Sequence, residues 1–316
     1  EQEAAGSPDD AQYFRIYSCG IRIQVYVPTG EANYHGNISG FDDDGSGTYT
    51  GGANALIEIP CDLLYFLLTE IWSDAFDTTA IAAARTAYDL GGGADYILAG
   101  QLHDPEQAED LVDQIARQGM SYIFQSTDGT WKHVVFELPG ATPDETFDQN
   151  AGDFIAANGP EVALDHSSSD QLYNQFEVGY GYDQGLQKFN DSEKVDESTA
   201  GAVGTWLTGS QSDWNVTRKL TTEAYWIHDA TTIAAYRNYL IYKHADRKRI
   251  VTFSVGWNGL AMELTDTVQL NHSALDKTAA GGADAHDYDL ISIEEDLSRG
   301  IMTFVGFQSD VPNAAL

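Results

Sequence analysis

NALIEIPCDLLYFLLTEIWSD (residues 54–74) begins the stretch of sequence that decides the fold. The stretch ends with MSYIFQSTDGTWKHVVFE (residues 120–137). Pro60 suits a helix start, because the N–H that proline lacks would have no partner in the first turn. Residues 61–72 are apolar on nearly every face, which predicts a helix buried on most sides. Residues 120–125 and 131–137, joined by Ser-Thr-Asp-Gly-Thr, predict a β-hairpin with a longer loop.

Two further helices are expected between these ends. Asp77 and the two threonines after it supply capping oxygens for an Ala-rich helix over residues 79–90, which the three glycines 91–93 end. Residues 105–118 repeat apolar positions every three or four residues and are followed by Gly119. Three helices and one hairpin predict a compact α+β unit.

The sequence on either side of this unit is richer in strands. Residues 12–27 alternate apolar with polar residues, which predicts a strand or a hairpin with Gly20 at the bend, and another short strand is expected at 34–38. After the unit, alternation predicts a strand over 176–182, and Asp229 is the expected N-cap of a helix over 230–245. Further strands are expected at 250–255, 260–264, 267–270, 288–294 and 300–306.

Two polar segments read as irregular structure. Residues 138–165 are rich in Pro, Gly, Asp and Asn, which predicts a connection and a boundary near Ser167. Residues 190–197, NDSEKVDE, predict an exposed loop between strands. The resulting fold class is α+β, β-rich and multidomain.

Candidate ligand sites are few. Asp42, Asp44 and Ser46 have the alternate spacing that opens a calcium loop, but the closing position is Ala53 instead of a bidentate Glu, so a solvated turn is the preferred interpretation. Cys19 and Cys61 are too few for a disulfide framework or a closed zinc site, and a bond between them stays open. We expect Cys61 to behave as a small hydrophobic residue.

No catalytic motif is present. The sequence contains no nucleophile elbow, zinc-protease helix, P-loop or dinucleotide fingerprint, and the eight histidines are scattered without metal-ligand spacing. We therefore expect a protein that is not an enzyme and takes no cofactor or metal.

The bulk properties describe an acidic globular chain. Its 316 residues are enough for about two domains, and 42% hydrophobic residues supply a core. No apolar run is long enough to span a bilayer and no basic-then-apolar leader is present, so no membrane insertion is expected. Since residue 1 is Glu and not Met, we expect the chain to start inside a longer or processed product.

At this point a family resemblance becomes visible. GTYTGGANALIEIP, CDLLYFLLTEIW, DTTAIAAA and QAEDLVDQIARQGMSYIFQSTDGTWKHVVFE resemble, in that order, the middle of tail-tip or baseplate hub proteins of long-tailed, siphovirus-like phages. DQLYNQFEVGYGYD, the helix and strand after Ala224, LAMELTDTVQLNH and YDLISIEEDLSRGIMTFVGF resemble later parts of the same family, so that the resemblance covers residues 47–308. The motif residues are Pro60, Gly119, Asp128, Gly129, Asn174 and Asp266; Thr265 stands where the family usually has Gly.

The resemblance implies a structural virion protein. Such hubs have tube-type β-barrel domains and form a homotrimer in which each subunit contributes two barrels to match a six-fold tail tube. Residues 166–312 would form one barrel, 10–53 part of a first barrel or an adjoining sheet, and 54–165 the inserted domain with its connection, between a frayed N-terminus (1–9) and a short tail (313–316).

The implied place is the tail tip of a virion, after synthesis in the host cytoplasm. The hub would close the distal tail tube, hold the end of the tape-measure protein and seat a central fibre or spike. The formal charge of −33 repels nucleic acid, so no direct binding to DNA is expected beyond its passage through the tube. Scarce Lys and an excess of Asp over Glu resemble proteins of halophilic organisms; an acidic virion protein without salt adaptation remains the alternative.

A second functional class stays open. The 17 Tyr, 6 Trp and many carboxylates also suit a secreted acidic protein that binds or cleaves carbohydrate. Sugar binding would need aromatic faces on one exposed surface beside a pair of carboxylates. Native mass separates the two classes, because a hub forms a symmetric oligomer and a glycan-active enzyme can work as a monomer.

Overall fold

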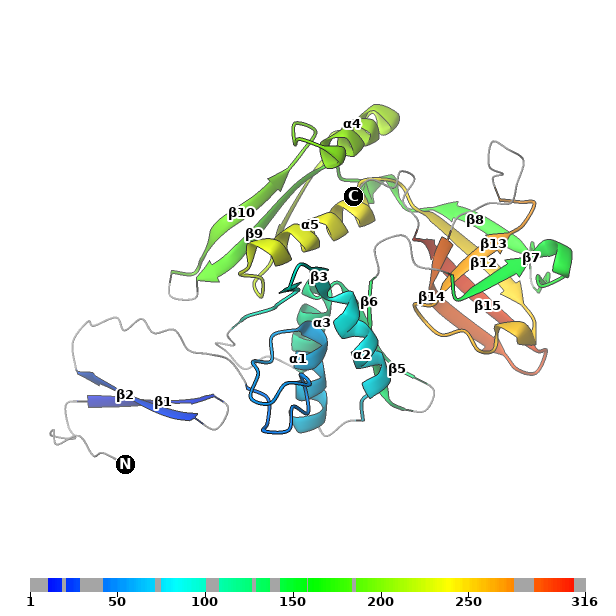
Figure 1. Cartoon of the computed structure of the whole chain (residues 1–316). Coiled ribbons are helices and arrows are strands. Elements are labelled where there is room, and N and C mark those ends of the chain that lie inside the picture. Colours follow the sequence, from blue (N-terminus) through cyan, green and yellow to red (C-terminus); the bar gives the residue numbers. More distant parts are fainter. Residues whose placement is uncertain are drawn as a thin grey trace.

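The computed structural model describes residues 11–18, 21–28, 42–71, 75–100, 108–126, 129–136, 143–157, 159–183, 186–275 and 287–309. Within these residues the fold is α+β and strand-rich, with five α-helices and a curled six-stranded sheet (Figure 1). The predicted fold class is confirmed. No helix of the described part has both the length and the apolar character needed to cross a bilayer.

The segment that was expected to form a helical unit does so. It contains α1 (Pro60–Phe66), a π-helical turn (Leu67–Ile71), α2 (Thr78–Ala87), α3 (Ala108–Gln118), and the hairpin of β5 (Ser121–Gln125) and β6 (Trp131–Val135). A short pair, β3 (Asp89–Gly91) and β4 (Ala94–Asp95), follows α2. The three predicted helices and the hairpin are confirmed, although residues 105–107 lie outside the described residues. The prediction that Gly91, Gly92 and Gly93 end the second helix is wrong, because α2 ends at Ala87 and β3 follows it. All three glycines have positive φ and belong to the tight connection between β3 and β4.

The next unit is a three-stranded sheet with two helices. It consists of β9 (Gln175–Asp183), β10 (Lys188–Val195), α4 (Ala202–Trp214), β11 (Lys219–Glu223) and α5 (Ala230–His244), with strand order β10-β9-β11. Asp229 caps α5 as expected, because its carboxylate accepts the N–H groups of Thr231 and Thr232. The prediction of a loop over 190–197 is wrong, since most of this segment is β10, which pairs antiparallel with β9 along its length. Cross-strand pairing outweighs the low strand propensity of its Asp and Asn residues.

The C-terminal part forms the six-stranded sheet. Its strands are β7 (Glu145–Asp148), β8 (Val162–His166), β12 (Arg249–Val255), β13 (Thr267–Asn271), β14 (Asp287–Asp296) and β15 (Ile301–Gln308), in the order β7-β13-β14-β15-β12-β8. Only β7 and β13 pair in parallel. The predicted strand over 260–264 is wrong, because these residues form turns between a 3₁₀ turn (Trp257–Gly259) and β13. The prediction of a connection over residues 138–165 is wrong in part, because this segment contains β7 and nearly all of β8, and both pair with strands that follow residue 166.

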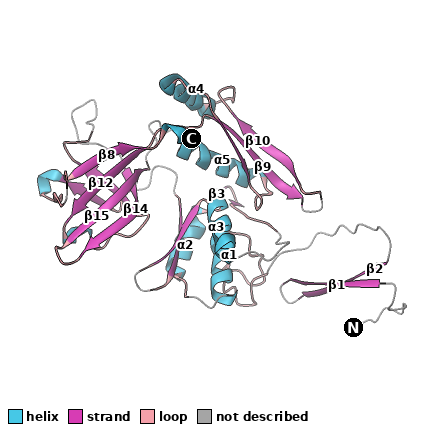
Figure 2. Ribbon diagram, turned by 180° about the vertical axis from the view of Figure 1, so that it is seen from behind, coloured by secondary structure: helices cyan, strands magenta, loops and turns pink. Residues whose placement is uncertain are grey.

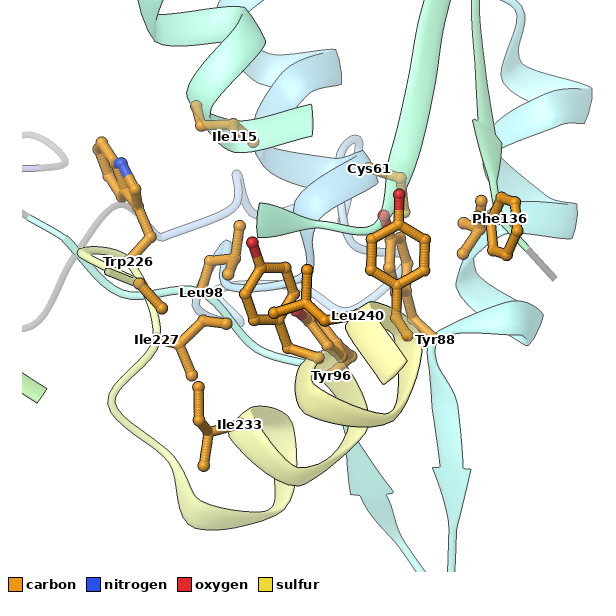
Figure 3. Close-up of a cluster of buried hydrophobic side chains, with 14 of the residues drawn as sticks. Cys61, Tyr88, Tyr96, Leu98, Ile115, Phe136, Trp226, Ile227, Ile233 and Leu240 are labelled. Carbon is orange, nitrogen blue, oxygen red and sulfur yellow. The ribbon is translucent and has the colours of Figure 1, made fainter. Parts of the chain in front are cut away.

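Two hydrophobic cores hold these parts. The first joins the helical unit to α5 and β9: Phe136 packs edge-on against Tyr239 at 5.0 Å between ring centroids, and Tyr88 and Tyr96 are fully buried (Figure 3). The N–H of Trp226 donates to Gln118 Oε1 across the same junction. The second core fills the six-stranded sheet around Phe147, Phe253 and Phe304. The helical unit and α5 therefore share one core, and the curled sheet has its own.

Strands β1 (Ala11–Ser18) and β2 (Ile21–Pro28) form an antiparallel hairpin, which is one of the two forms expected there. Both views show this hairpin standing apart from the rest of the chain (Figures 1 and 2). Gly20, Cys19 and the predicted strand at 34–38 lie outside the described residues. Cys61 is fully buried in the first core and forms no disulfide with another described residue. Burial raises the pKa of its thiol well above the usual value, as suits an inert core residue.

Candidate functional site

The acidic loop before α1 uses its carboxylates internally. Both oxygens of Asp44 accept hydrogen bonds, from the N–H and hydroxyl of Ser46 and from those of Thr48, at 2.6 to 3.1 Å. These bonds, first of all that from the Thr48 hydroxyl, hold the pKa of Asp44 well below its usual value. Asp42 lies beside them and forms an isolated bridge with Leu56. The metal candidates Asp42, Asp44 and Ser46 thus lie in one loop, where the carboxylate of Asp44 already accepts four hydrogen bonds from Ser46 and Thr48, so a solvated turn stays the preferred interpretation.

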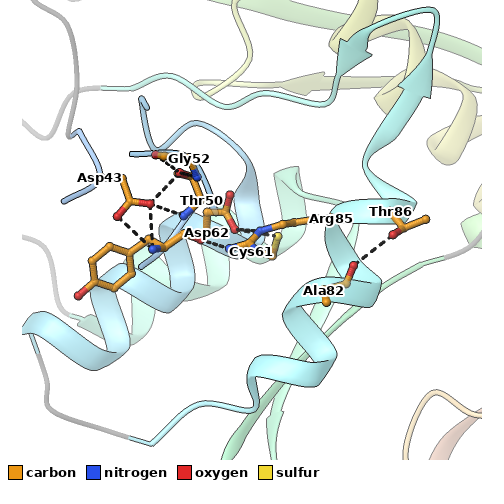
Figure 4. Close-up of polar contacts among 9 residues, drawn as sticks. Asp43, Thr50, Gly52, Cys61, Asp62, Ala82, Arg85 and Thr86 are labelled. Carbon is orange, nitrogen blue, oxygen red and sulfur yellow. Dashed lines mark hydrogen bonds and ion pairs between the residues drawn. The ribbon is translucent and has the colours of Figure 1, made fainter. Parts of the chain in front are cut away.

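A buried ion pair ties this loop to α1 and α2. Asp62 on α1 is fully buried, and its Oδ1 accepts a hydrogen bond from Arg85 Nε at 2.7 Å (Figure 4). The guanidinium of Arg85 also donates to the carbonyl of Tyr49 in the loop. Burial raises the pKa of Asp62, and Arg85 lowers it part of the way back. Arg85 therefore positions the loop on the helices and neutralises a buried carboxylate.

Two motif residues of the helical unit contact each other. Pro60 is at the first position of α1, as predicted, and is buried. A Cβ atom on Gly119 would lie 2.8 Å from Pro60 Cβ and 2.9 Å from the carbonyl oxygen of Ile115. The hydroxyl of Tyr88 donates to the carbonyl of Gly119 at 2.6 Å. Only glycine fits where α3 ends against the start of α1.

Of the other motif residues, Asp128 lies outside the described residues, and Gly129 has φ +86° in the β5–β6 turn. Asn174 is fully buried ahead of β9. Its side chain donates to the carbonyl of Val216 at 2.7 Å and accepts the N–H of Arg218 at 3.0 Å. Asn174 thereby fixes the start of β9 against the start of its parallel partner β11.

Asp266 immediately precedes β13 and organises the turn before this strand. Its carboxylate accepts the N–H of Glu263 at 2.8 Å. Burial, with the charges of Asp144 and Glu263, raises its pKa. Thr265 has φ +78°, so a β-branched residue occupies the left-handed conformation that glycine adopts without cost. Thr265, which stands where hub-like sequences usually have glycine, therefore keeps the backbone conformation that glycine would adopt in this turn.

An acidic cleft of about 780 Å³ lies between the β5–β6 hairpin and the six-stranded sheet. Its carboxylates include Asp144, Glu263, Asp266, Asp287 and Asp289. Lys132 on β6 crosses the cleft to form an ion pair with Glu263. Phe124, Val134 and Ile291 are among its apolar lining residues.

A second cavity, of about 830 Å³, lies on the other side of β5 between α3 and α5. Its lining is mostly apolar and aromatic, with Val112 and Ala116 from α3 and Tyr236 and Tyr239 from α5. Lys243 lies beside it and donates to the Tyr239 hydroxyl at 3.1 Å. Sequence reasoning missed both cavities, because each is formed by elements that are far apart in the chain.

The basic residues near the end of α5 are engaged within the chain. Lys248 is 1% exposed, with its ammonium 3.9 Å from the ring centroid of Tyr242. Arg247 lies over Trp214 and donates to the carbonyl of Ser167. This segment is therefore mainly part of the packing between α4, α5 and β12.

No catalytic arrangement is evident in the described part of the chain, where no group of three or more His, Cys, Asp or Glu side chains could hold a metal ion. Burial lowers the pKa of His133 to about 3, so this histidine is neutral at pH 7, with Nε2 lying 3.3 Å from the Tyr88 hydroxyl. Its surroundings are the first core and not a cleft.

No protein-family model and no curated protein matches the chain. Among solved structures, a chain of the virion of a native gene transfer agent particle has 10% identity and a TM-score of 0.43, over 72% of this chain and 44% of that one. Prophage tail protein gp18 from Listeria monocytogenes EGD-e has 11% identity and a TM-score of 0.36, over 63% and 52%. The 43 kDa tail protein of prophage MuSo2 from Shewanella oneidensis has 15% identity and a TM-score of 0.43, over 98% and 86%.

These similar structures are virion and tail proteins by their descriptions. The present chain spans about half the length of the first two. At such identities and TM-scores the likeness does not assign a function.

Proposed function

We propose that this chain is a structural component of a viral tail, a hub at the tail tip that assembles as a homotrimer. The proposal rests on the order of the hub-like motifs along residues 47–308 and on one feature of the fold. Each outer strand of the curled sheet, β7 and β8, has one partner strand among the described residues, and its other edge is open. Open strand edges are an assembly device when a second subunit supplies the missing partner.

In this function the trimer closes the distal end of the tail tube. The curled sheet contributes the tube-like layer, the helical unit is inserted on its side, and the ring contacts the tail tube protein and holds the tape-measure end. A central fibre or spike is seated on the opposite face. The proposed domain limits are residues 10–53, 54–165 and 166–312, but β7 and nearly all of β8, which belong to the curled sheet, fall within the second range. The proposed location is the tail tip of a virion, and adaptation to a halophilic host is the proposed reason for the acidic composition.

Electron microscopy of the purified chain in molar salt tests this function. The expected result is a ring with three-fold symmetry and a central channel. Labelling virus particles with antibodies against the chain should then mark the tip of the tail. Particles without a channel, or label spread along the tail or on the capsid, would contradict the hub.

One observation favours the carbohydrate-binding alternative. Tyr182 on β9, Phe189 on β10 and Tyr225 just after β11 form a cluster with ring centroids 4.8 to 5.0 Å apart, and Tyr225 is 41% exposed. Its hydroxyl donates to the carboxylate of Glu223. The rings pack on one another at steep angles, which leaves little flat aromatic face for a sugar. A glycan array with Tyr225→Ala as control tests this alternative, and specific binding lost in the variant would support it.

A further inference from the structure

The outer edge of β5 has no partner strand in the part of the chain that the structure describes. Strand β5 pairs with β6, and no other described strand pairs with its far side. Its sequence, SYIFQ, has no charge and no proline, the residues that usually protect an exposed edge. The chain therefore offers a row of backbone donors and acceptors at this edge.

The register identifies which backbone groups face outward. Phe136 N–H donates to the Met120 carbonyl, and Ser126 N–H donates to the Thr130 carbonyl. Because hydrogen-bonded pairs alternate along an antiparallel ladder, Tyr122 and Phe124 direct their backbone groups at β6. The N–H and C=O of Ile123 therefore face outward, as do those of its neighbours two residues away.

The two cavities lie on opposite faces of this edge. Ser121 lines only the apolar cavity between α3 and α5 and Phe124 only the acidic cleft, whereas Tyr122 and Ile123 between them line both. Residues alternate between the two faces of a strand. In a strand added to β5, every second side chain would thus point toward the apolar cavity. The side chains that alternate with these would point toward the carboxylates of the acidic cleft. The matching ligand is an extended segment in which apolar residues alternate with residues that are not acidic and include an arginine or lysine.

The chain itself carries such a segment. Residues 11–30 form its longest run without Asp or Glu, and this run includes Arg15 and Arg22. In the β1–β2 register Arg15 pairs with Gln24 and Tyr17 with Arg22, so both arginines belong to one face of the hairpin. The opposite face takes Phe14, Ile16, Ile21, Ile23, Val25 and Val27. A two-stranded hairpin with one apolar face is marginally stable until that face is covered.

We propose that the β1–β2 hairpin of one copy adds to the open edge of β5 in a neighbouring copy. Strand β2 pairs with β5, the aliphatic face of the hairpin covers the apolar cavity, and Arg15 and Arg22 face the acidic cleft. Main-chain hydrogen bonds supply affinity, and the two cavities select the alternating pattern. The two partner surfaces are different, so the contact is head-to-tail and closes a ring when the rotation between copies allows it.

This contact rests on the self-association in the proposed function, but not on a place in a viral tail. Arg15→Glu/Arg22→Glu is the test variant, because it leaves every residue of the two described cores unchanged and should leave them folded. Lys188→Glu/Arg218→Glu is the matched control, with the same change in net charge on other elements. Sedimentation of the full chain in molar salt gives the association constant. Hydrogen exchange of a peptide spanning residues 120–125 reports on the edge of β5.

The hairpin variant should dissociate at least about tenfold more readily than the wild type, and the control should not. Exchange at Ile123 and Gln125 should be at least about tenfold slower in the wild-type oligomer than in the hairpin variant. Reversing the cleft with Asp144→Arg/Asp289→Arg should restore association to the hairpin variant.

Three results would overturn the proposal, and they are distinguishable. An oligomer that survives in the hairpin variant, with unchanged exchange at β5, leaves self-association standing and rejects this contact. If the amides of β5 in a monomer are protected from hydrogen exchange to the same degree at every protein concentration, the hairpin binds β5 of its own chain and not of a neighbouring copy. A monomer with an exchanging β5 in every salt rejects both this contact and the proposed ring.

Discussion

Replacing Arg85 with alanine tests whether the first core depends on a single cation for its buried carboxylate. Asp62 is fully buried, and among the described residues its Oδ2 has no hydrogen-bond partner. Arg85, 29% exposed at its side chain, supplies the ion pair through Oδ1. Without Arg85 the carboxylate is left charged in an apolar surrounding.

The expected cost of Arg85→Ala at pH 7 is about 3 kcal/mol, the lower end for breaking a buried pair by removing one partner. Burial already raises the pKa of Asp62, and loss of Arg85 raises it further. A raised folded-state pKa gives stability that is present below the unfolded pKa and lost as the pH rises through the folded one. The cost should therefore shrink as the pH is lowered toward 4. Asp62→Asn in the same chain should recover at least about 1 kcal/mol at pH 7, because no charge is then buried.

Urea unfolding in molar salt measures this, with fluorescence as the signal, because Trp131 and Trp226 belong to the first core. Arg218→Ala is the matched control, since its pair with Asp170 is exposed and should contribute less than about 1 kcal/mol. The reasoning is refuted if Arg85→Ala costs no more than the control, or if Asp62→Asn makes the double variant less stable still.

Three more predictions follow from the described contacts. Gly119→Ala should cost about 2 to 3 kcal/mol in urea unfolding, because its Cβ would overlap Pro60 and the Ile115 carbonyl; an unchanged midpoint would contradict the close packing. Asp229→Ala should cost about 1 kcal/mol at pH 7 by removing the cap of α5. The hydrogen bond from the N–H of Thr232, more than the other contacts, holds the pKa of Asp229 below its usual value. The stability that the cap contributes is therefore present above the pKa of Asp229 in the unfolded chain and is lost as the pH falls through its pKa in the folded chain. A cost of Asp229→Ala that is equal at pH 7 and pH 2 would argue against the cap. Millimolar calcium should leave the melting temperature unchanged, because Asp44 is saturated by its own loop, whereas a saturable rise that Asp44→Asn abolishes would reveal a site.

Much of the local structure follows from caps and periodicity. Pro60, the Asp77 cap and the Asp229 cap each mark a helix start that the structure confirms, because the orphan N–H groups of a first turn must find partners close in sequence. The β5–β6 hairpin was equally predictable, since its turn and its alternation agree. Information within one turn or one strand is enough in these cases.

Elements stabilised by distant partners were not predictable. Helix α4 contains Gly204 and Gly209, which disfavour a helix, yet Leu207 is fully buried in the first core. Strands β7 and β8 lie in a Pro- and Gly-rich segment and are defined by pairing with β13 and β12, more than 80 residues later. Tertiary pairing outweighs local propensity in both.

The residues of the candidate site also fall into two groups, those whose type marks them in the sequence and those that only the fold brings together. The motif residues Pro60, Gly119 and Asn174 occupy close contacts between elements, and their residue types mark such positions in the sequence. The acidic cleft and the apolar cavity need Tyr122, Asp289 and Tyr239 to meet, and no sequence spacing connects these residues. Their chemistry became visible only once the fold had placed them around β5.

The native mass of the chain in molar salt and in dilute buffer tests the central claim most directly. For the proposed trimer, light scattering in molar salt should give about 104 kDa, three times the 34.5 kDa of one chain. In dilute buffer the trimer should dissociate or unfold, because a formal charge of −33 on each chain is then poorly screened. A folded monomer of 34.5 kDa at both ionic strengths would contradict the proposed trimeric hub.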